Sequence, residues 1–183
     1  MRKYAMKMKL ILIIALSLVL LFSGTKIVKY SYDGLSNKKS NAQLQETYHQ
    51  AKEADKPEKY SDKFKELIKI NSDLVGWIHL PNTSIDYPVV QTVDNDYYLT
   101  HSFEKEESDH GAIYMDYRNI QDSQKMVHTI IYGHYMKDGT MFKSLNNYKT
   151  EDYAKKNPYI EFDTLEGPTK WQIFSVYVIR AKN

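Results

Sequence analysis

The sequence predicts a mainly β domain that follows an N-terminal membrane helix and a polar stalk. Short apolar runs separated by turn residues fill the chain from Leu74 onward, which is typical of strands. An uncharged apolar run from residue 10 to residue 25 lies between lysines, as in a transmembrane helix. The 183 residues are enough for one globular domain with a hydrophobic core and for these accessory segments.

The charges are unevenly distributed along the chain. Six of the 25 basic residues precede the first acidic residue, Asp33, so the rest of the chain has 19 basic and 23 acidic residues. A nucleic-acid-binding protein needs a clustered basic face that displaces counterions from phosphates. We therefore expect no nucleic-acid partner.

Residues 1–9 form a basic tail, and residues 10–25 form the predicted transmembrane anchor. The apolar run is slightly shorter than the roughly 18 to 20 residues of a full span, but Lys9 and Lys26 can extend it by snorkelling. A cleaved signal peptide is the alternative, although Ser23-Gly24-Thr25 is a poor match to its cleavage site. The basic flank predicts a single-pass protein of the cell membrane, with a cytoplasmic N-terminus and an extracellular domain.

Residues 26–60 are mostly polar and are predicted to form a stalk, and the domain is expected to span residues 61–183. Ser61 or Asp62 can cap a short first helix. The apolar residues expected to face inward there are Phe64, Leu67, Ile68 and Leu74.

Six strands are predicted from the apolar runs: 76–80, 85–90, 112–115, 129–132, 159–163 and 170–179. Pro88 confines the second strand to a sheet edge or a bulge. Residues 141–148 and 150–157 have the spacing of short helices. The last strand is apolar on both faces, which predicts a position near the centre of a sheet with both faces covered.

The absence of cysteine excludes disulfides, thiolate metal sites and a cysteine nucleophile within these 183 residues. His134 is the most promising reactive side chain, because it follows the predicted strand 129–132 at the start of a loop. An imidazole transfers protons near neutral pH, although a single histidine at a strand end is more often structural.

Other chemistries have weaker support in the sequence. The remaining histidines, at positions 49, 79, 101, 110 and 128, lack metal-ligand spacing, so neither a metal nor another cofactor is expected. His101 and His110 are expected to lie in a solvated loop. No G-x-S-x-G motif marks a serine nucleophile. Asn95 lies in a polar turn, and Leu99 follows it.

Several stretches together resemble one family, the class B sortases of Gram-positive bacteria, over about residues 61–180. The matching stretches are I-N-S-D-L-V-G-W-I (70–78), I-D-Y-P-V-V-Q (85–91), D-N-D-Y-Y-L (94–99), G-A-I-Y-M-D (111–116), T-I-I-Y-G-H (129–134), M-K-D-G-T-M-F (136–142) and Q-I-F-S-V-Y (172–177). Each stretch alone is a weak signal, but their order and spacing make the set specific.

The resemblance implies a membrane-anchored cysteine transpeptidase with a β-barrel and a His, Cys and Arg active site. In this family a thiolate cleaves a sorting signal after its threonine, and an amine of a peptidoglycan precursor resolves the acyl-enzyme. His134 matches the catalytic histidine. Asn95 and Leu99 match positions beside the sorting-signal peptide. The implied partners are therefore this peptide, the peptidoglycan amine and, through the N-terminal helix, the membrane.

The chain departs from the family pattern at its C-terminal end. It ends at Asn183, before the family's cysteine and arginine, and Arg180 does not match that arginine. Residues 61–183 are therefore expected to form a partial class B sortase domain, an incomplete barrel with an unpaired edge and without transpeptidase activity of its own. One alternative is a catalytically inactive extracellular peptide-binding module that keeps part of the groove. Another is an unrelated extracellular β domain.

Overall fold

The computed structural model describes residues 2–53, 59–119 and 128–179, in two compact units, Met1–Ser36 and Asn37–Asn183. Arg180, residues 54–58 of the predicted stalk, and residues 120–127 and 180–183 of the predicted domain lie outside the described residues. The helices are α1 (Arg2–Glu53), α2 (Lys65–Ile70) and α3 (Glu151–Lys156), with three 3-10 helices, η1 (Tyr60–Phe64), η2 (Tyr97–Leu99) and η3 (Phe142–Lys149). The strands are β1 (Leu74–His79), β2 (Asp86–Val90), β3 (Ile113–Met115), β4 (Ile131–Tyr132), β5 (Tyr159–Thr164) and β6 (Pro168–Gln172).

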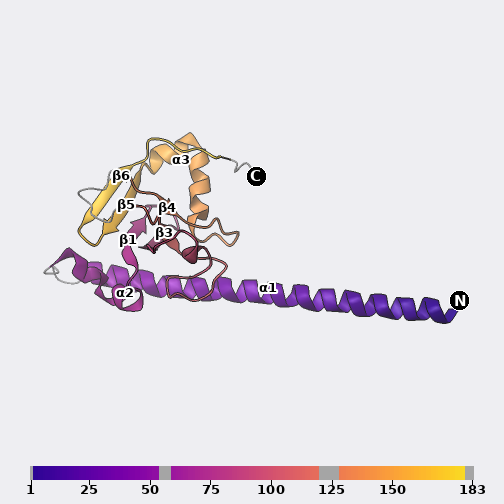
Figure 1. The fold of residues 1–183 in the computed structure, drawn as a ribbon. Helices are drawn as coiled ribbons and strands as arrows, with labels where there is room; N and C mark the ends of the chain where they lie inside the picture. The colour runs from indigo at the N-terminus through magenta and orange to yellow at the C-terminus, as the bar shows by residue number, and fades with distance from the viewer. Residues whose placement is uncertain (1, 54–58, 120–127, 180–183) are drawn as a thin grey trace. The chain divides into compact units, whose positions relative to one another are not determined.

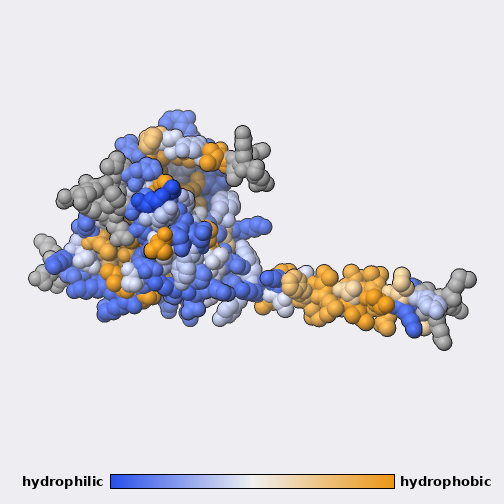
Figure 2. All heavy atoms as spheres, viewed as in Figure 1, coloured by the Kyte–Doolittle hydropathy of each residue, from blue (hydrophilic) through white to orange (hydrophobic). Residues whose placement is uncertain are grey.

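The first unit consists of the N-terminal part of α1. Its apolar side chains from Leu10 to Phe22 are exposed on all sides of the helix, and Figure 2 shows them as a continuous hydrophobic surface. The candidate span begins at Met6, and its most apolar window is unburied. A helix that is apolar on every side is unsuited to water but suited to lipid. By length and composition, α1 is therefore a candidate membrane span.

The second unit is built on one six-stranded sheet with the order β4-β3-β2-β1-β5-β6 (Figure 1). Neighbouring strands are antiparallel except for β2 and β3, which are parallel. The long connection between β2 and β3 contains η2, and the connection between β4 and β5 contains η3 and α3. The predicted mainly β domain with short helices is confirmed.

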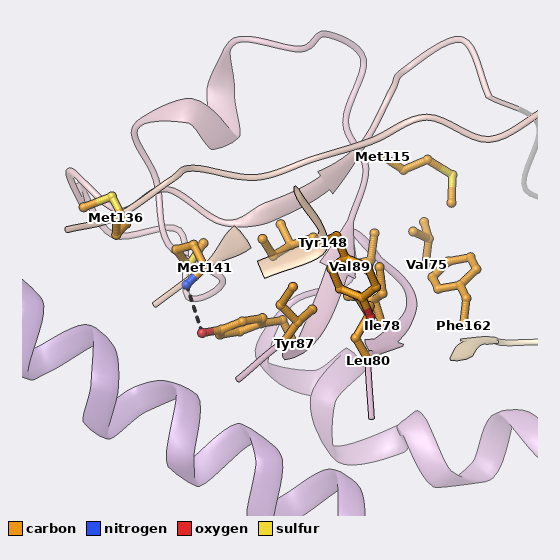
Figure 3. Packing of buried hydrophobic residues seen from close by; sticks show 12 residues of the cluster. Val75, Ile78, Leu80, Tyr87, Val89, Met115, Met136, Met141, Tyr148 and Phe162 are labelled. Atoms are coloured by element: carbon orange, nitrogen blue, oxygen red, sulfur yellow. Dashed lines mark hydrogen bonds between the residues drawn. The ribbon is translucent and has the colours of Figure 1, made fainter. Parts of the chain in front are cut away.

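Side chains alternate between two hydrophobic clusters, because successive residues of a strand point to opposite faces of a sheet. Val89 and Ile113 belong to a cluster that also contains Met136, Met141 and Tyr148 (Figure 3). Their strand neighbours belong to the second cluster, which contains the following residues: Leu44, Tyr48, Phe64, Leu67, Leu74, Trp77, Val90, Tyr98, Phe103, Ala112 and Tyr114. The sheet therefore carries a packed layer on each face.

The C-terminal part of α1 contributes to the second cluster. Leu44 and Tyr48 are buried, and the ring of Tyr48 stacks on Trp77 with 4.2 Å between ring centroids. The Tyr48 hydroxyl donates a hydrogen bond to the carboxylate of Asp163 on β5. Part of the polar segment 26–60 is thus a helix that packs on the sheet.

Five predicted strands and both predicted helices after residue 140 are present within one or two residues of their expected ends. The sixth predicted strand, 170–179, is present only as β6, and the prediction that it continues to residue 179 with both faces covered is wrong. β6 ends at Gln172, where the ladder with β5 runs out at Tyr159, and Phe174 is 99% exposed. Within the described residues β6 has only β5 as a strand partner, and the last backbone hydrogen bond on this side runs from the Ile173 N–H to the Pro158 carbonyl.

The prediction that Pro88 confines its strand to a sheet edge or a bulge is wrong, because β2 is an inner strand. β2 lies between β1 and β3, but its pairing with β3 is limited to Val89 and Val90. Pro88 precedes these residues, so its missing N–H interrupts no hydrogen bond with β3. The irregularity of the ladder lies on the opposite strand, between Leu74 and Gly76.

Candidate active site

Strand β4 positions His134 at the end of the sheet. β4 pairs with β3 through Tyr132 opposite Tyr114 and Ile131 opposite Met115. Gly133 follows, and a Cβ atom there would lie 2.4 Å from Cδ1 of Ile113. Only glycine fits this close approach without a shift of its neighbours, so the sequence Tyr-Gly-His delivers the imidazole directly beyond a packed strand end.

The loop that begins at His134 closes on itself. The carbonyl oxygen of His134 accepts a hydrogen bond from the Phe142 N–H at 2.9 Å, and Tyr135 forms an antiparallel bridge with Met141. The Met141 N–H donates to the Tyr87 hydroxyl on β2 at 3.0 Å, the dashed line in Figure 3. Residues 134–142, which we call the His134 loop, are therefore tied to the sheet at both ends.

The His134 side chain is half-buried. Burial, together with the nearby His110, lowers the pKa of the His134 imidazole, since both disfavour its charged form. The described residues provide no hydrogen-bond partner for this imidazole. A histidine that is neutral near neutral pH can accept a proton from a neighbouring thiol or hydroxyl.

Asn95 is linked to the strand of His134 through a buried carboxylate. Its side-chain amide donates to Asp116 at 3.0 Å, and Asp116 also accepts from the Tyr132 hydroxyl at 3.0 Å. Arg118 binds the same carboxylate through Nε at 2.9 Å and through a terminal nitrogen at 2.7 Å. These hydrogen bonds, those from Arg118 first, lower the pKa of Asp116. Asn95 and the strand that carries His134 are thus connected through one ionised side chain.

Leu99 lies at the end of η2 and is 39% exposed. Its helix is fixed to the start of β3, because the Ala112 N–H donates to the Tyr98 carbonyl at 3.0 Å. Gly111 has a φ of +58°, and a Cβ atom there would lie 2.5 Å from the Tyr98 carbonyl oxygen. The structure therefore places Leu99 beside the segment that leads into β3.

An apolar cavity of about 300 Å³ lies beside β4. It is lined by Ile78, Leu80, Thr129, Ile131, Phe142, Leu145, Ile160, Phe162 and Trp171. A larger cavity of about 530 Å³, near η1 and β6, is lined by Lys63 and Asp163 and includes no residue of the His134 loop. Across residues 2–53, 59–119 and 128–179, no group of three or more His, Asp or Glu side chains could hold a metal ion.

Sequence reasoning missed two residues near the candidate site. His110 was expected in a solvated loop, but it is fully buried, so that prediction is wrong. Its Nε2 lies 3.3 Å from Oδ2 of Asp138, inside the His134 loop. Its burial could have been predicted from its position directly before Gly111 and the apolar run 112–115. Asp116 was missed because its many partners come from separate segments.

Comparisons with known proteins give a consistent result. A family model described as the Sortase domain matches residues 78–183. The sortase B of Listeria monocytogenes is 37% identical over 160 residues, which are 87% of this chain and 65% of that protein. The sortase B of Staphylococcus aureus is 36% identical over 171 residues, which are 93% of this chain and 69% of that protein. The chain thus spans about two thirds of the length of these relatives.

Solved structures agree with the sequence comparisons. The Staphylococcus aureus sortase B–substrate complex superposes with a TM-score of 0.72 at 37% identity, over 79% of this chain and 66% of that chain. Sortase B from Bacillus anthracis in complex with AAEK1 gives 0.69 at 37% identity, over 83% and 74%. A sortase B complexed with triglycine gives 0.70 at 36% identity, over 78% and 65%.

Proposed function

The chain belongs to the sortase family, in its class B, and from this membership we propose that it is a cysteine transpeptidase of the cell surface. The proposed reaction cleaves a sorting signal after its threonine and joins the surface protein to an amine of the cell-wall peptidoglycan. One observation carries the proposal: His134 lies two residues beyond the end of strand β4, within the residues that match the Sortase domain. Relatives solved with a substrate and with triglycine support a peptide donor and an amine acceptor.

His134 is the proposed general acid and base of this reaction. Its neutral imidazole would take the proton of a cysteine thiol, and the thiolate would attack the carbonyl carbon of the threonine. The C–N bond then breaks, and the imidazolium returns its proton to the leaving amine. The incoming amine then attacks the thioester carbonyl carbon and gives a proton to the imidazole, while the C–S bond breaks and releases the thiolate. One difficult step thus becomes two easier ones. Asn95 and Leu99 are the proposed contacts to the sorting peptide.

The nucleophile of this reaction is not among the 183 residues, which contain no cysteine. We expect the 183-residue polypeptide alone to give no turnover, because an imidazole cannot replace the thiolate in the acyl-enzyme. The measurement is cleavage of fluorogenic peptides with Asn-Pro-x-Thr or Ser-Pro-x-Thr motifs, with a cysteine-containing class B sortase as the positive control. Cleavage by the purified polypeptide would contradict this expectation.

A second candidate function is peptide binding without chemistry. It is favoured by one observation: Leu99 is 39% exposed at the end of η2, and Asn95 is linked through Asp116 to Tyr132 on β4. On this proposal the chain binds the sorting peptide, and Leu99→Ala weakens the affinity about tenfold, through the loss of apolar contact area. Fluorescence anisotropy of a labelled peptide measures this change.

Leu165→Ala is the matched control for the binding test. Leu165 is half-buried in the turn between β5 and β6 and packs against the second hydrophobic cluster, so its truncation perturbs packing without touching the proposed groove. Equal losses of affinity in the two variants would contradict the proposal that Leu99 contacts the sorting peptide. No measurable affinity of the unmodified chain for either peptide type would remove the binding function.

We also propose that α1 anchors the protein in the cell membrane, with its N-terminus in the cytoplasm and the second unit outside. Support comes from the apolar surface of the helix and from the basic residues that precede it, since positive flanks stay on the cytoplasmic side. Proteinase K added to intact spheroplasts should digest the sheet-containing unit and spare a small N-terminal fragment. Protection of the whole chain until the cells are lysed would reverse the orientation.

A further inference from the structure

His110 is a fully buried histidine that the proposed reaction leaves without a role. It lies two residues before the Ala112 N–H that is bonded to η2, and it is followed by Gly111, which packs against the Tyr98 carbonyl. Its backbone position is therefore fixed against η2. A buried imidazole must satisfy its polar atoms within the protein, and Nε2 of His110 lies 3.3 Å from Oδ2 of Asp138.

Asp138 is the acidic residue at the tip of the His134 loop. Its Oδ1 accepts hydrogen bonds from the Thr140 N–H at 3.1 Å and from the Thr140 hydroxyl at 2.6 Å. Burial alone would raise the pKa of Asp138, but the hydrogen bonds from Thr140 and from His110 outweigh burial and lower this pKa to about 2. The carboxylate is therefore ionised at all physiological pH values. It stabilises the turn at the tip of the loop through Thr140, and it also lies beside His110.

Other charged or titratable groups face Asp138 from neighbouring elements. Lys38 of α1 places its ammonium 3.6 Å from Oδ2, with half of the lysine side chain exposed. The phenol of Tyr87 on β2 holds the far end of the loop through the Met141 N–H, and the Asp138 charge contributes to the raised pKa of this phenol, after burial. Among Lys38, Tyr87 and His110, only His110 is completely buried. His110 also lowers the pKa of His134.

We propose that His110 and Asp138 form a positioning pair for His134, which holds the His134 loop against the start of β3 and keeps the imidazole of His134 half-buried. The inference rests on the proposed function, because it gives the pair a role in the acid–base step. The mechanism has two parts. The contact between His110 and Asp138 fixes the loop whose closing hydrogen bond is the one from Phe142 to His134. A loop held in this way keeps the imidazole of His134 half-buried, and this burial lowers its pKa, so His134 stays available as a base.

The first test is an NMR titration of the histidine rings in the full 183-residue chain in detergent micelles. The His134 signals are assigned by their loss in His134→Gln. We expect His110→Gln to raise the pKa of His134, because the loss of the contact with Asp138 loosens the loop and relieves the burial that lowers this pKa. His101→Gln is the matched control: His101 stacks on Tyr97 and is bonded to the Tyr97 carbonyl, so the pKa of His134 should not change.

The second test examines the loop and remains informative if His110→Gln fails to fold. Asp138→Asn removes the ionised acceptor from a partly exposed position, and we expect about tenfold faster hydrogen exchange at the Phe142 amide, as for the loss of one hydrogen bond to a charged group. Exchange at amides of β1, such as that of Ile78, should be unchanged.

An unchanged pKa of His134 in a folded His110→Gln variant, or unchanged exchange at Phe142 in Asp138→Asn, overturns the inference. Neither readout requires turnover. A shifted pKa in a protein that neither binds nor cleaves a sorting peptide would therefore leave the pair intact and overturn only the proposed function.

Discussion

At the scale of single residues, the candidate site depends on a glycine that allows β4 to approach its neighbours closely. Gly133 lets β4 lie against Ile113 and Phe142, and a Cβ atom there would lie 2.8 Å from a ring carbon of Phe142. Phe142 in turn donates the hydrogen bond that closes the His134 loop. The position of the imidazole is thus set by the absence of a methyl group one residue before it, and any added atom must push either the strand or the loop.

Gly133→Ala should therefore be destabilising and should disturb His134. Overpacking a well-filled site costs about 1 to 3 kcal/mol, which outweighs the entropic benefit of replacing glycine. Urea unfolding in detergent, together with the NMR shift of the His134 ring, measures both effects. Gly167→Ala is the control, since no atom lies within 4 Å of its added Cβ, and its stability should change by less than about 0.5 kcal/mol. Equal stability of the two variants would contradict the packing argument.

At the scale of elements, the local sequence pattern was sufficient to predict a strand or helix wherever its neighbours are close in sequence. The apolar run before Gly133 predicted β4, and the same run predicted that His134 starts a loop. Tertiary partners decided the rest. The polar composition around Tyr48 concealed a helix that packs on Trp77, because amphipathic tyrosines bury a ring while the hydroxyl bonds to a distant carboxylate. The apolar pattern after Gln172 predicted a strand, but strand pairing needs a partner, and β5 begins at Tyr159.

The candidate site could be only partly predicted, because its residues come from separate elements of the sheet. His134 was visible from its own flanking sequence, whereas its connection to Asn95 passes through Asp116, which follows β3. Asp116 looks like an ordinary acidic residue after a strand, and only the folded sheet brings Asn95 and Tyr132 to the same carboxylate. The burial of His110 likewise requires the contact between the segment before β3 and the His134 loop, which no local periodicity encodes.

At the scale of the whole molecule, the net acidic second unit uses several carboxylates as internal hydrogen-bond acceptors. Asp86 accepts from the Trp77 indole at 2.6 Å and faces His49 at 2.8 Å. Asp163 accepts from Lys63 at 2.6 Å, and Asp138 anchors the His134 loop. These three acceptors join the C-terminal part of α1, η1, the sheet and the loop, so their ionisation is linked to the stability of the entire unit rather than to one element.

The stability of the second unit should consequently fall in acid. Burial alone would raise the pKa of Asp86, but hydrogen bonds from His79, His49 and Trp77 outweigh it and lower this pKa to about 2. Hydrogen bonds likewise outweigh burial at Asp138 and lower its pKa to about 2. Because these folded-state values lie below the unfolded value of about 3.9, the stabilisation is complete above about pH 4 and is lost as the pH falls towards about 2.

Above about pH 4, each of the two carboxylates, Asp86 and Asp138, contributes about 2 kcal/mol to the free energy of unfolding. Urea unfolding of the full chain in detergent at pH values from 5 to 2 measures the loss, which should be steepest between about pH 4 and pH 2. The double variant Asp86→Asn with Asp138→Asn should be less stable at pH 5 but should show a much shallower decline, since neither position then titrates. An equally steep decline in the double variant would assign the acid sensitivity to other carboxylates and would contradict the stabilising roles of Asp86 and Asp138.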